Sequence, residues 1–68
     1  MTAEQMFKEI GWKKTQDNDS VVSYYHKRYD ETIEFSKEYK EYYVYNLAID
    51  MVILKAIIQQ CKELGWLD

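Results

Sequence analysis

The chain has 68 residues, of which 47% are hydrophobic, 16% aromatic and 31% charged, with no proline, two glycines and one cysteine. This length and composition predict one globular domain over residues 1–68, too small to enclose the large cavity that most enzyme folds need. Nine basic against 12 acidic residues give a net charge of −3, which disfavours a bulk electrostatic grip on nucleic acid. We therefore expect a non-enzymatic protein without a cofactor.

The sequence also indicates the compartment. A single cysteine, Cys61, excludes an internal disulfide and fits a reducing environment. The first residues are neither basic nor apolar enough for a secretion signal, and the longest apolar run, residues 51–54, is far below the ~20 residues of a membrane span. We predict a soluble, cytoplasmic protein without membrane contact.

A short helix is predicted from Ala3. Thr2 and Gln5 have the spacing of a capping box, in which each side chain satisfies a backbone N–H at the helix start. Gly11 follows where helices end with a left-handed residue. The apolar stripe of this helix consists of Ala3, Met6, Phe7 and Ile10. A helix this short is marginal alone, so it must pack on the rest of the domain.

Residues 12–49 are rich in Tyr, Val, Thr, Ile and Phe, and they predict an antiparallel meander of three or four strands. A polar turn at residues 17–20 separates the first two strands. The second strand is expected over residues 21–29, with a two-residue turn at Asp30 and Glu31 and a third strand over residues 32–36. This pairing places Lys27 opposite Glu34. One face then carries Val22, Tyr24, His26, Ile33 and Phe35.

A second turn near residues 37–39 leads to the fourth strand, which has two alternating sets of side chains. We expect the set containing Tyr43, Tyr45, Leu47 and Ile49 to face inward, because it continues into aliphatic residues. A change of one residue in loop length would invert this choice.

A long C-terminal helix is predicted from Met51, with Asp50 as its N-cap and Gly65 at its end. Trp12 and Trp66, which follow the two glycines, are expected to fold back onto the core. The predicted apolar stripe is Met51, Leu54, Ile57, Ile58, Cys61 and Leu64, and the predicted polar side is Lys55, Gln59, Gln60, Lys62 and Glu63. Val52 and Ile53 lie partly outside the stripe and are either covered within the fold or offered to a partner. The resulting architecture is α+β, α-β-β-β-β-α, with both helices on one sheet face.

No residue pattern predicts catalysis or metal binding. His26 is the only histidine and has no suitably spaced partners, so we expect a partly buried, hydrogen-bonded ring. Cys61 lies on the apolar stripe and is expected to be an inert core residue. The acidic residues of the turns lack the glycine-containing loop of a calcium site. We therefore assign no catalytic, metal or cofactor-binding residue.

Seven tyrosines fall within residues 24–45, more than one sheet face can bury. We expect Tyr25, Tyr29 and Tyr42 on the open face, with Lys27 and Arg28 beside them, as a surface that binds a protein partner or a second copy of the chain in a homodimer. The same residues could stack weakly on single-stranded nucleic acid. An acidic mimic that blocks a nucleic-acid enzyme is a further alternative, and an ordinary, partly solvated sheet face requires no partner.

Four segments carry a resemblance to a known group of proteins: Met6 and Phe7, Gly11 and Trp12, residues 54–57 and residues 61–66. Over most of its length the chain resembles small uncharacterised proteins encoded in prophages and mobile elements of Gram-positive bacteria. The resemblance supplies no catalytic residue. It implies an accessory factor that binds a host or phage protein.

Overall fold

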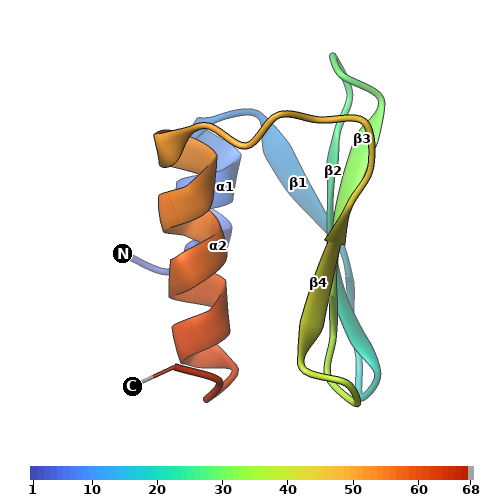
Figure 1. The fold of residues 1–68 in the computed structure, drawn as a ribbon. Helices are drawn as coiled ribbons and strands as arrows, with labels where there is room; N and C mark the ends of the chain where they lie inside the picture. The colour runs from blue at the N-terminus through green and yellow to red at the C-terminus, as the bar shows by residue number, and fades with distance from the viewer. Residues whose placement is uncertain (68) are drawn as a thin grey trace.

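The computed structural model describes residues 1–67 and has a four-stranded sheet with one helix before it and one helix after it in the chain (Figure 1). The elements are α1 (Ala3–Glu9), β1 (Trp12–Asp17), β2 (Val21–His26), β3 (Glu31–Ser36), β4 (Glu41–Val44) and α2 (Met51–Glu63). The sheet is antiparallel in the order β1-β2-β3-β4, and both helices lie on one side of it. The predicted α-β-β-β-β-α architecture is confirmed.

Helix α1 begins with the predicted capping box. The Gln5 N–H donates to Thr2 Oγ1 at 3.2 Å, and the Thr2 N–H donates to Gln5 Oε1 at 2.9 Å. Ala3 and Phe7 are fully buried, as the predicted stripe requires. The chain then leaves the helix through Gly11, whose φ of +93° is the expected left-handed conformation.

Gly11 also lies against His26. The Nε2–H of His26 donates to the carbonyl oxygen of Ile10 at 3.1 Å, while its Nδ1 accepts the N–H of Tyr29 at 3.4 Å. A Cβ atom at Gly11 would lie 2.5 Å from His26 Nε2. The prediction of a hydrogen-bonded histidine is therefore confirmed, although the ring is buried rather than partly buried, and only glycine fits beside it.

Gly11→Ala is expected to lower the free energy of unfolding by about 1–3 kcal/mol, because alanine strains the left-handed backbone and displaces His26. Urea denaturation measures this loss. Gly65→Ala is the matched control, since Gly65 has a φ of +78° but no atom within 4 Å of an added Cβ. Equal losses in the two variants would show that the contact with His26 carries no weight.

The first hairpin agrees with the predicted turn, and β1 contains a bulge. The Oδ1 atom of Asn18 accepts the N–H groups of Ser20 and Val21 at 2.8 and 3.0 Å, which closes the turn. In β1 the register passes from Lys14 to Gln16 without a partner for the residue between them. Because the bulge adds one residue, the side chain of Lys14 and that of Asp17 both point to the helix side.

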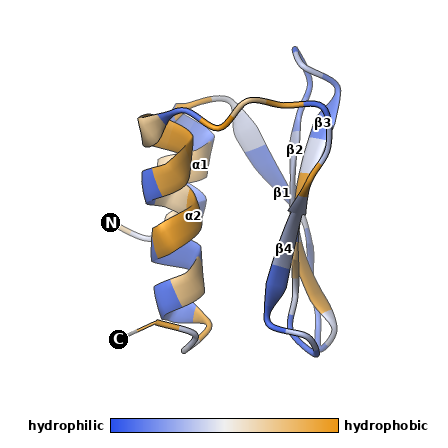
Figure 2. Ribbon diagram, viewed as in Figure 1, coloured by the Kyte–Doolittle hydropathy of each residue, from blue (hydrophilic) through white to orange (hydrophobic). Residues whose placement is uncertain are grey.

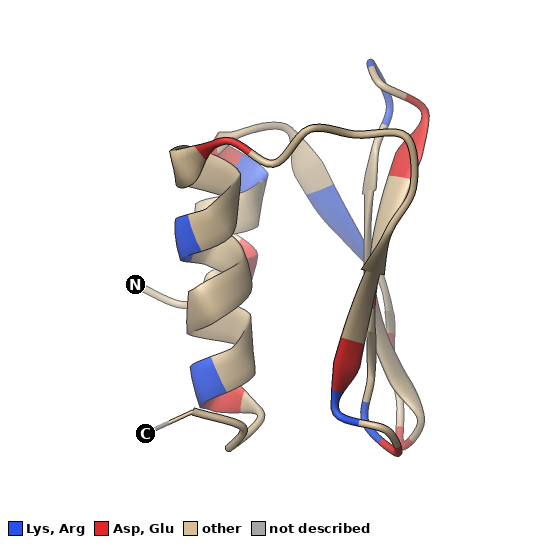
Figure 3. Cartoon of the chain, in the orientation of Figure 1, with Lys and Arg blue, Asp and Glu red and all other residues tan. Residues whose placement is uncertain are grey.

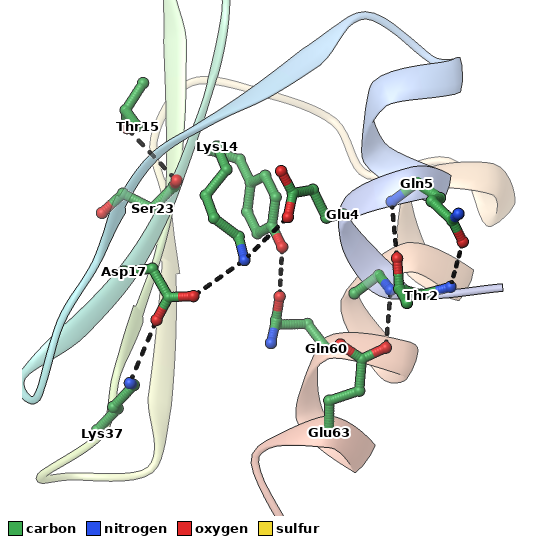
Figure 4. A network of polar contacts seen from close by, with 12 residues as sticks. Thr2, Glu4, Gln5, Lys14, Thr15, Asp17, Ser23, Lys37, Gln60 and Glu63 are labelled. Atoms are coloured by element: carbon green, nitrogen blue, oxygen red, sulfur yellow. Dashed lines mark hydrogen bonds and ion pairs between the residues drawn. The ribbon is translucent and has the colours of Figure 1, made fainter.

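This bulge lets Lys14 connect the sheet to α1 (Figure 4). Its Nζ lies 3.3 Å from Glu4 Oε1 and 3.0 Å from Asp17 Oδ2, and Lys37 Nζ lies 3.5 Å from Asp17 Oδ1. The hydrogen bond from Lys14 holds the pKa of Asp17 below its ordinary value. These groups are partly solvated, so the network positions β1 more than it stabilises the fold.

The second hairpin differs from the predicted one. Strand β2 ends at His26, and a four-residue loop, residues 27–30, replaces the two-residue turn. Asp30 adopts a φ of +50°, and Ser23 rather than Lys27 lies opposite Glu34. Relative to the prediction, the pairing of β2 with β3 is displaced by an even number of residues, so the same side chains stay on the inner face of the sheet. The predicted inner set of Val22, Tyr24, His26, Ile33 and Phe35 is confirmed.

The third hairpin overturns the prediction for the fourth strand. Its loop, residues 37–40, also has four residues and ends with Lys40 at a φ of +54°. Tyr42 consequently lies opposite Phe35, and Val44 opposite Ile33, on the helix side of the sheet. The expectation that Tyr43 faces inward was therefore wrong. The observed loop length shifts the pairing by an odd number of residues, which turns the other set of β4 side chains to the inner face.

The connection after β4 also differs from the prediction, because the strand ends at Val44. Leu47 and Ile49 reach the core from an irregular segment rather than from a strand, and Tyr45 is exposed. These residues therefore have no common strand face.

Helix α2 begins at the predicted N-cap but is rotated relative to the predicted stripe. Asp50 Oδ1 accepts the N–H of Ile53 at 2.8 Å. The buried residues are Ile53, Ala56, Ile57, Gln60 and Cys61, whereas Met51 and Ile58 are exposed. The stripe prediction was therefore right for Ile57, Cys61 and Leu64, and wrong for Met51, Ile58 and Gln60. Of the two alternatives left open for Ile53, the structure shows the covered one.

The rotation has a physical cause, since α2 packs on α1 as well as on the core side chains of the sheet. The hydroxyl of Tyr24 donates to Gln60 Oε1, so the buried amide oxygen is satisfied. The N–H of Ala3 donates to Glu63 Oε2 at 2.8 Å and joins the two helices. Burial raises the pKa of Tyr24 to about 12, so this phenol stays protonated as a donor well into the alkaline range.

Phe7 lies at the centre of the core. Its ring stacks on Tyr24 at a centroid distance of 4.1 Å and meets Trp12 and Phe35 edge-on at 6.2 and 6.4 Å. Trp66 packs beside Phe35 at 6.3 Å. The prediction that both tryptophans fold back onto the core is confirmed.

Candidate functional site

The five residues of the predicted interaction surface do not share one face of the sheet. Tyr25 lies on the outer face of β2, opposite Thr32. Lys27, Arg28 and Tyr29 belong to the loop that follows β2, and Tyr42 lies on the inner face of β4. The predicted placement of Tyr29 and Tyr42 beside Tyr25 was therefore wrong, because of the loop lengths described above. A binding role for any of these residues stays a prediction.

Tyr29 turns back towards the helix side of the sheet. Its ring stacks on His26 at a centroid distance of 4.2 Å and an interplanar angle of 23°. His26 in turn meets Trp12 edge-on at 5.1 Å. Tyr29 thus covers one end of the core instead of extending the outer face.

The outer face of the sheet offers hydroxyl and carboxylate groups rather than free aromatic rings. The hydroxyl of Tyr25 donates to Asp30 at 2.8 Å, and that of Tyr43 donates to Glu41 at 2.5 Å. These hydrogen bonds to carboxylates raise the pKa of both phenols. The two tyrosines therefore have their polar ends engaged within this face.

Exposed apolar side chains gather at a groove of about 360 Å³ between β4 and α2. Tyr42, Ile58 and Leu67, which are 43%, 37% and 49% exposed, form its open parts. The complete lining is Lys40, Tyr42, Leu54, Ile57, Ile58, Cys61, Trp66 and Leu67. Lys40 is the one charged residue among them, so a partner would meet an apolar surface.

The rotation of α2 produces one wall of this groove. Leu54 and Ile58 are four residues apart and lie on the same flank of the helix, away from α1. Ile57 is buried between this flank and the core. Figure 2 shows hydrophobic segments recurring along α2 among hydrophilic ones. One side of the apolar arc stabilises the fold, and its other side remains open to the groove.

The opposite wall and one end of the groove depend on β4 and on the C-terminal turn. The ring of Tyr42 lies 6.0 Å from that of Phe35. After α2, the Gly65 N–H donates to the Lys62 carbonyl oxygen at 3.0 Å and the Trp66 N–H donates to the Cys61 carbonyl oxygen at 2.9 Å. This pair of bonds is a Schellman motif, which turns the chain sharply and directs Trp66 against the sheet.

The one charged residue that lines the groove is cationic although the chain is acidic overall. This residue, Lys40, is exposed and reaches the groove from the sheet. Figure 3 shows the basic segments of α2 on the side of the helix turned away from the sheet. The single acid of α2, Glu63, accepts hydrogen bonds from the Ala3 N–H and from Gln59 Nε2, on the α1 side. The lining of the groove therefore favours a negative group beside Lys40.

Cys61 lies on the floor of the groove and is only 8% exposed. Burial raises the pKa of its thiol, so the reactive thiolate is scarce at neutral pH. The predicted core position of Cys61 is confirmed.

Cys61 is therefore expected to react slowly with a polar maleimide in the native protein and at the rate of a free thiol in denaturant. Mass spectrometry of timed aliquots measures both rates. Rapid labelling of the native protein would show that the groove opens to its floor.

Two other hollows have different linings. One, of about 400 Å³, lies between α1 and β1 and is lined by Glu4, Lys8, Gly11, Trp12, Lys13 and Lys14, of which Lys14 is already paired with Glu4. The other, of about 520 Å³, runs along the exposed side of α1. Neither gathers exposed large apolar side chains as the groove does, apart from Met1 at the N-terminus.

Groups that could bind a metal ion do not converge in the described part of the chain. Among residues 1–67, no three His, Cys, Asp or Glu side chains are placed to hold a metal ion. Both ring nitrogens of His26 are engaged in hydrogen bonds. Within the same residues, no helix is long and apolar enough to cross a membrane.

The sequence analysis assigned Leu54 and Ile58 to the core and so missed the groove. One signal was present in the sequence. The apolar arc of α2 from Met51 to Cys61 is wider than a single contact face requires, which indicates a second contact surface. Nothing comparable in the sequence indicated which set of β4 side chains faces inward, the choice that brings Tyr42 to the groove.

No protein-family model, curated protein or solved structure matches the chain. The resemblance to prophage and mobile-element proteins stays a prediction.

Proposed function

We propose that this chain is a non-enzymatic protein-binding module that receives apolar side chains of a partner in the groove between β4 and α2. The observation that carries this proposal is the gathering of Tyr42, Ile58 and Leu67 around one groove. Contiguous exposed apolar surface is typical of interaction sites. Its removal from water supplies about 25 cal/mol per Å² of buried apolar area.

The lining of the groove supports a protein partner rather than a small substrate. Its volume of about 360 Å³ is near the lower limit for small-molecule sites, which also place several polar groups around the ligand. Here Lys40 is the only charged lining residue, and the remaining surface is aliphatic or aromatic. A few side chains of a protein segment would fill such a groove.

Binding of single-stranded nucleic acid has less support. It requires several aromatic rings on one cationic platform. Tyr25 lies on the outer face, whereas Tyr29 and Tyr42 lie towards the helix side. Figure 3 shows acidic and basic segments interspersed over the molecule, which also gives no support to an acidic mimic. An accessory role in a phage or mobile element is consistent with protein binding and is part of the proposal.

The test is a selection of random peptides displayed on phage against the wild-type protein, followed by affinity measurements with two variants. Ile58→Glu places a charge in the groove. Val52→Glu is the matched control, because Val52 is an exposed apolar residue that does not line the groove. We expect selected peptides to bind Ile58→Glu at least about tenfold more weakly and Val52→Glu equally well. The proposal fails when no peptide is selected, or when every peptide binds both variants equally.

A further inference from the structure

The groove lies along a free edge of the sheet. Strand β4 pairs with β3 on one side, and no strand of residues 1–67 pairs with its other side. A sheet edge carries backbone N–H and C=O groups that can pair with an added strand. The inner face of this edge bears Tyr42 and Val44, and Tyr42 lines the groove.

The two edges of the sheet are built differently. Strand β1 has a bulge after Lys14, and Lys14 and Asp17 point inward there. Bulges and inward-pointing charges are devices that prevent a further strand from pairing. The β3–β4 register runs without a bulge from Ser36 to Ile33, and the inward residues of β4 are apolar or aromatic. Only the β4 edge therefore combines regular pairing with an apolar surface.

We infer that the groove binds an extended, acidic segment of the partner, which pairs with β4 as a fifth strand. This inference rests on the proposed function and specifies its ligand. In an added strand every second side chain points to the helix side, where Leu54 and Ile58 would cover it. A helical segment has its backbone N–H and C=O groups bonded within the helix, so it could not pair with the edge of β4.

The charge of the segment follows from the lining of the groove. Lys40 is the one charged residue in that lining, it is exposed, and the neighbouring Glu41 points to the outer face. A single exposed ion pair contributes little, so backbone pairing and apolar contacts supply the affinity and Lys40 selects acidic segments.

The experiment uses three sets of short synthetic peptides with a fluorescent label. The first alternates apolar residues with Asp or Glu, and the second replaces each acid by Lys. The third consists of the acidic peptides with N-methyl groups on every second backbone amide. Two versions of each are made, one methylated at the odd positions and one at the even positions, and these are the two phases. Fluorescence anisotropy measures binding, and amide hydrogen exchange of β4 (Glu41–Val44) reports strand addition.

We expect the acidic set to bind at least about tenfold more tightly than the lysine set. The variant Lys40→Glu should reverse this preference, and Lys13→Glu, on the other edge of the sheet, should leave it unchanged. N-methylation in one phase should abolish binding, and exchange at β4 should slow in the complex.

The outcomes separate the inference from the function on which it rests. Peptides that lose affinity for Ile58→Glu but tolerate N-methylation in both phases, or prefer Lys, would overturn the inference and leave the proposed function standing. A dimer in sedimentation that is disrupted by Ile58→Glu would also overturn it, because the occupant would then be a second copy. Peptide binding that is indifferent to Ile58→Glu would overturn both.

Discussion

Replacing Phe7 by alanine is expected to lower the free energy of unfolding by about 3–5 kcal/mol. Phe7 is fully buried and contacts three other core rings, so alanine would leave a cavity that the helices cannot close. At roughly 0.05–0.15 kcal/mol per residue, a domain of this size has a total stability of only about 3–10 kcal/mol. Urea denaturation followed by circular dichroism measures the loss, which should remove most of the stability.

Two further variants show whether this loss depends on the position of Phe7. Phe7→Leu keeps much of the buried volume and should cost less than Phe7→Ala. Tyr39→Ala removes an aromatic ring that is 67% exposed and should change stability by no more than about 0.5 kcal/mol. A midpoint for Phe7→Ala equal to that of Tyr39→Ala would contradict the central position of Phe7.

The features of the fold that depend on near neighbours in the chain were predictable. The capping box of Thr2 and Gln5, the N-cap of Asp50 and the helix end at Gly11 each involve residues within a few positions. Their geometry is determined by short-range hydrogen bonds and by the conformational freedom of glycine. The predicted helices therefore begin and end close to the observed positions.

The register of the sheet was harder to predict from the sequence. In both hairpins whose loop length was predicted wrongly, the loop ends with a non-glycine residue in a left-handed conformation. Asp30 and Lys40 adopt φ values of +50° and +54° at the ends of their loops. Asp is a familiar turn residue, but lysine gives no signal for this conformation. The inward-facing residues of β2 and β3 were predicted correctly, because a pairing displaced by an even number of residues keeps the same side chains on each face. For β4 the predicted loop was wrong by an odd number of residues, which exchanged the two faces.

The candidate groove needed two facts that periodicity does not contain. One is the parity of β4, which places Tyr42 on the helix side. The other is the rotation of α2, in which Gln60 is buried because Tyr24 donates a hydrogen bond to it. Both are tertiary contacts between segments distant in the sequence. The apolar width of α2 was visible in the sequence, but the side that remains open was not.

The second large effect is expected at Ile57. Ile57→Ala should lower the free energy of unfolding by about 2–5 kcal/mol, because this side chain of α2 is only 1% exposed and packs in the core. Ile58→Ala, at the next position, removes the same atoms from a side chain that is 37% exposed and should cost clearly less. Urea denaturation of the two variants under identical conditions gives the difference.

This matched pair also separates folding from binding. The sequence pattern placed Ile57 and Ile58 in one buried stripe, so equal losses of stability would support that orientation of α2 and remove one wall of the groove. With the observed rotation, Ile58→Ala should remain folded and bind groove-selected peptides more weakly. Ile57→Ala should lose stability as well as binding, since Ile57 also lines the groove, so only Ile58→Ala shows a loss of binding without a loss of folding. Full peptide affinity in folded Ile58→Ala would place the binding surface elsewhere on the domain.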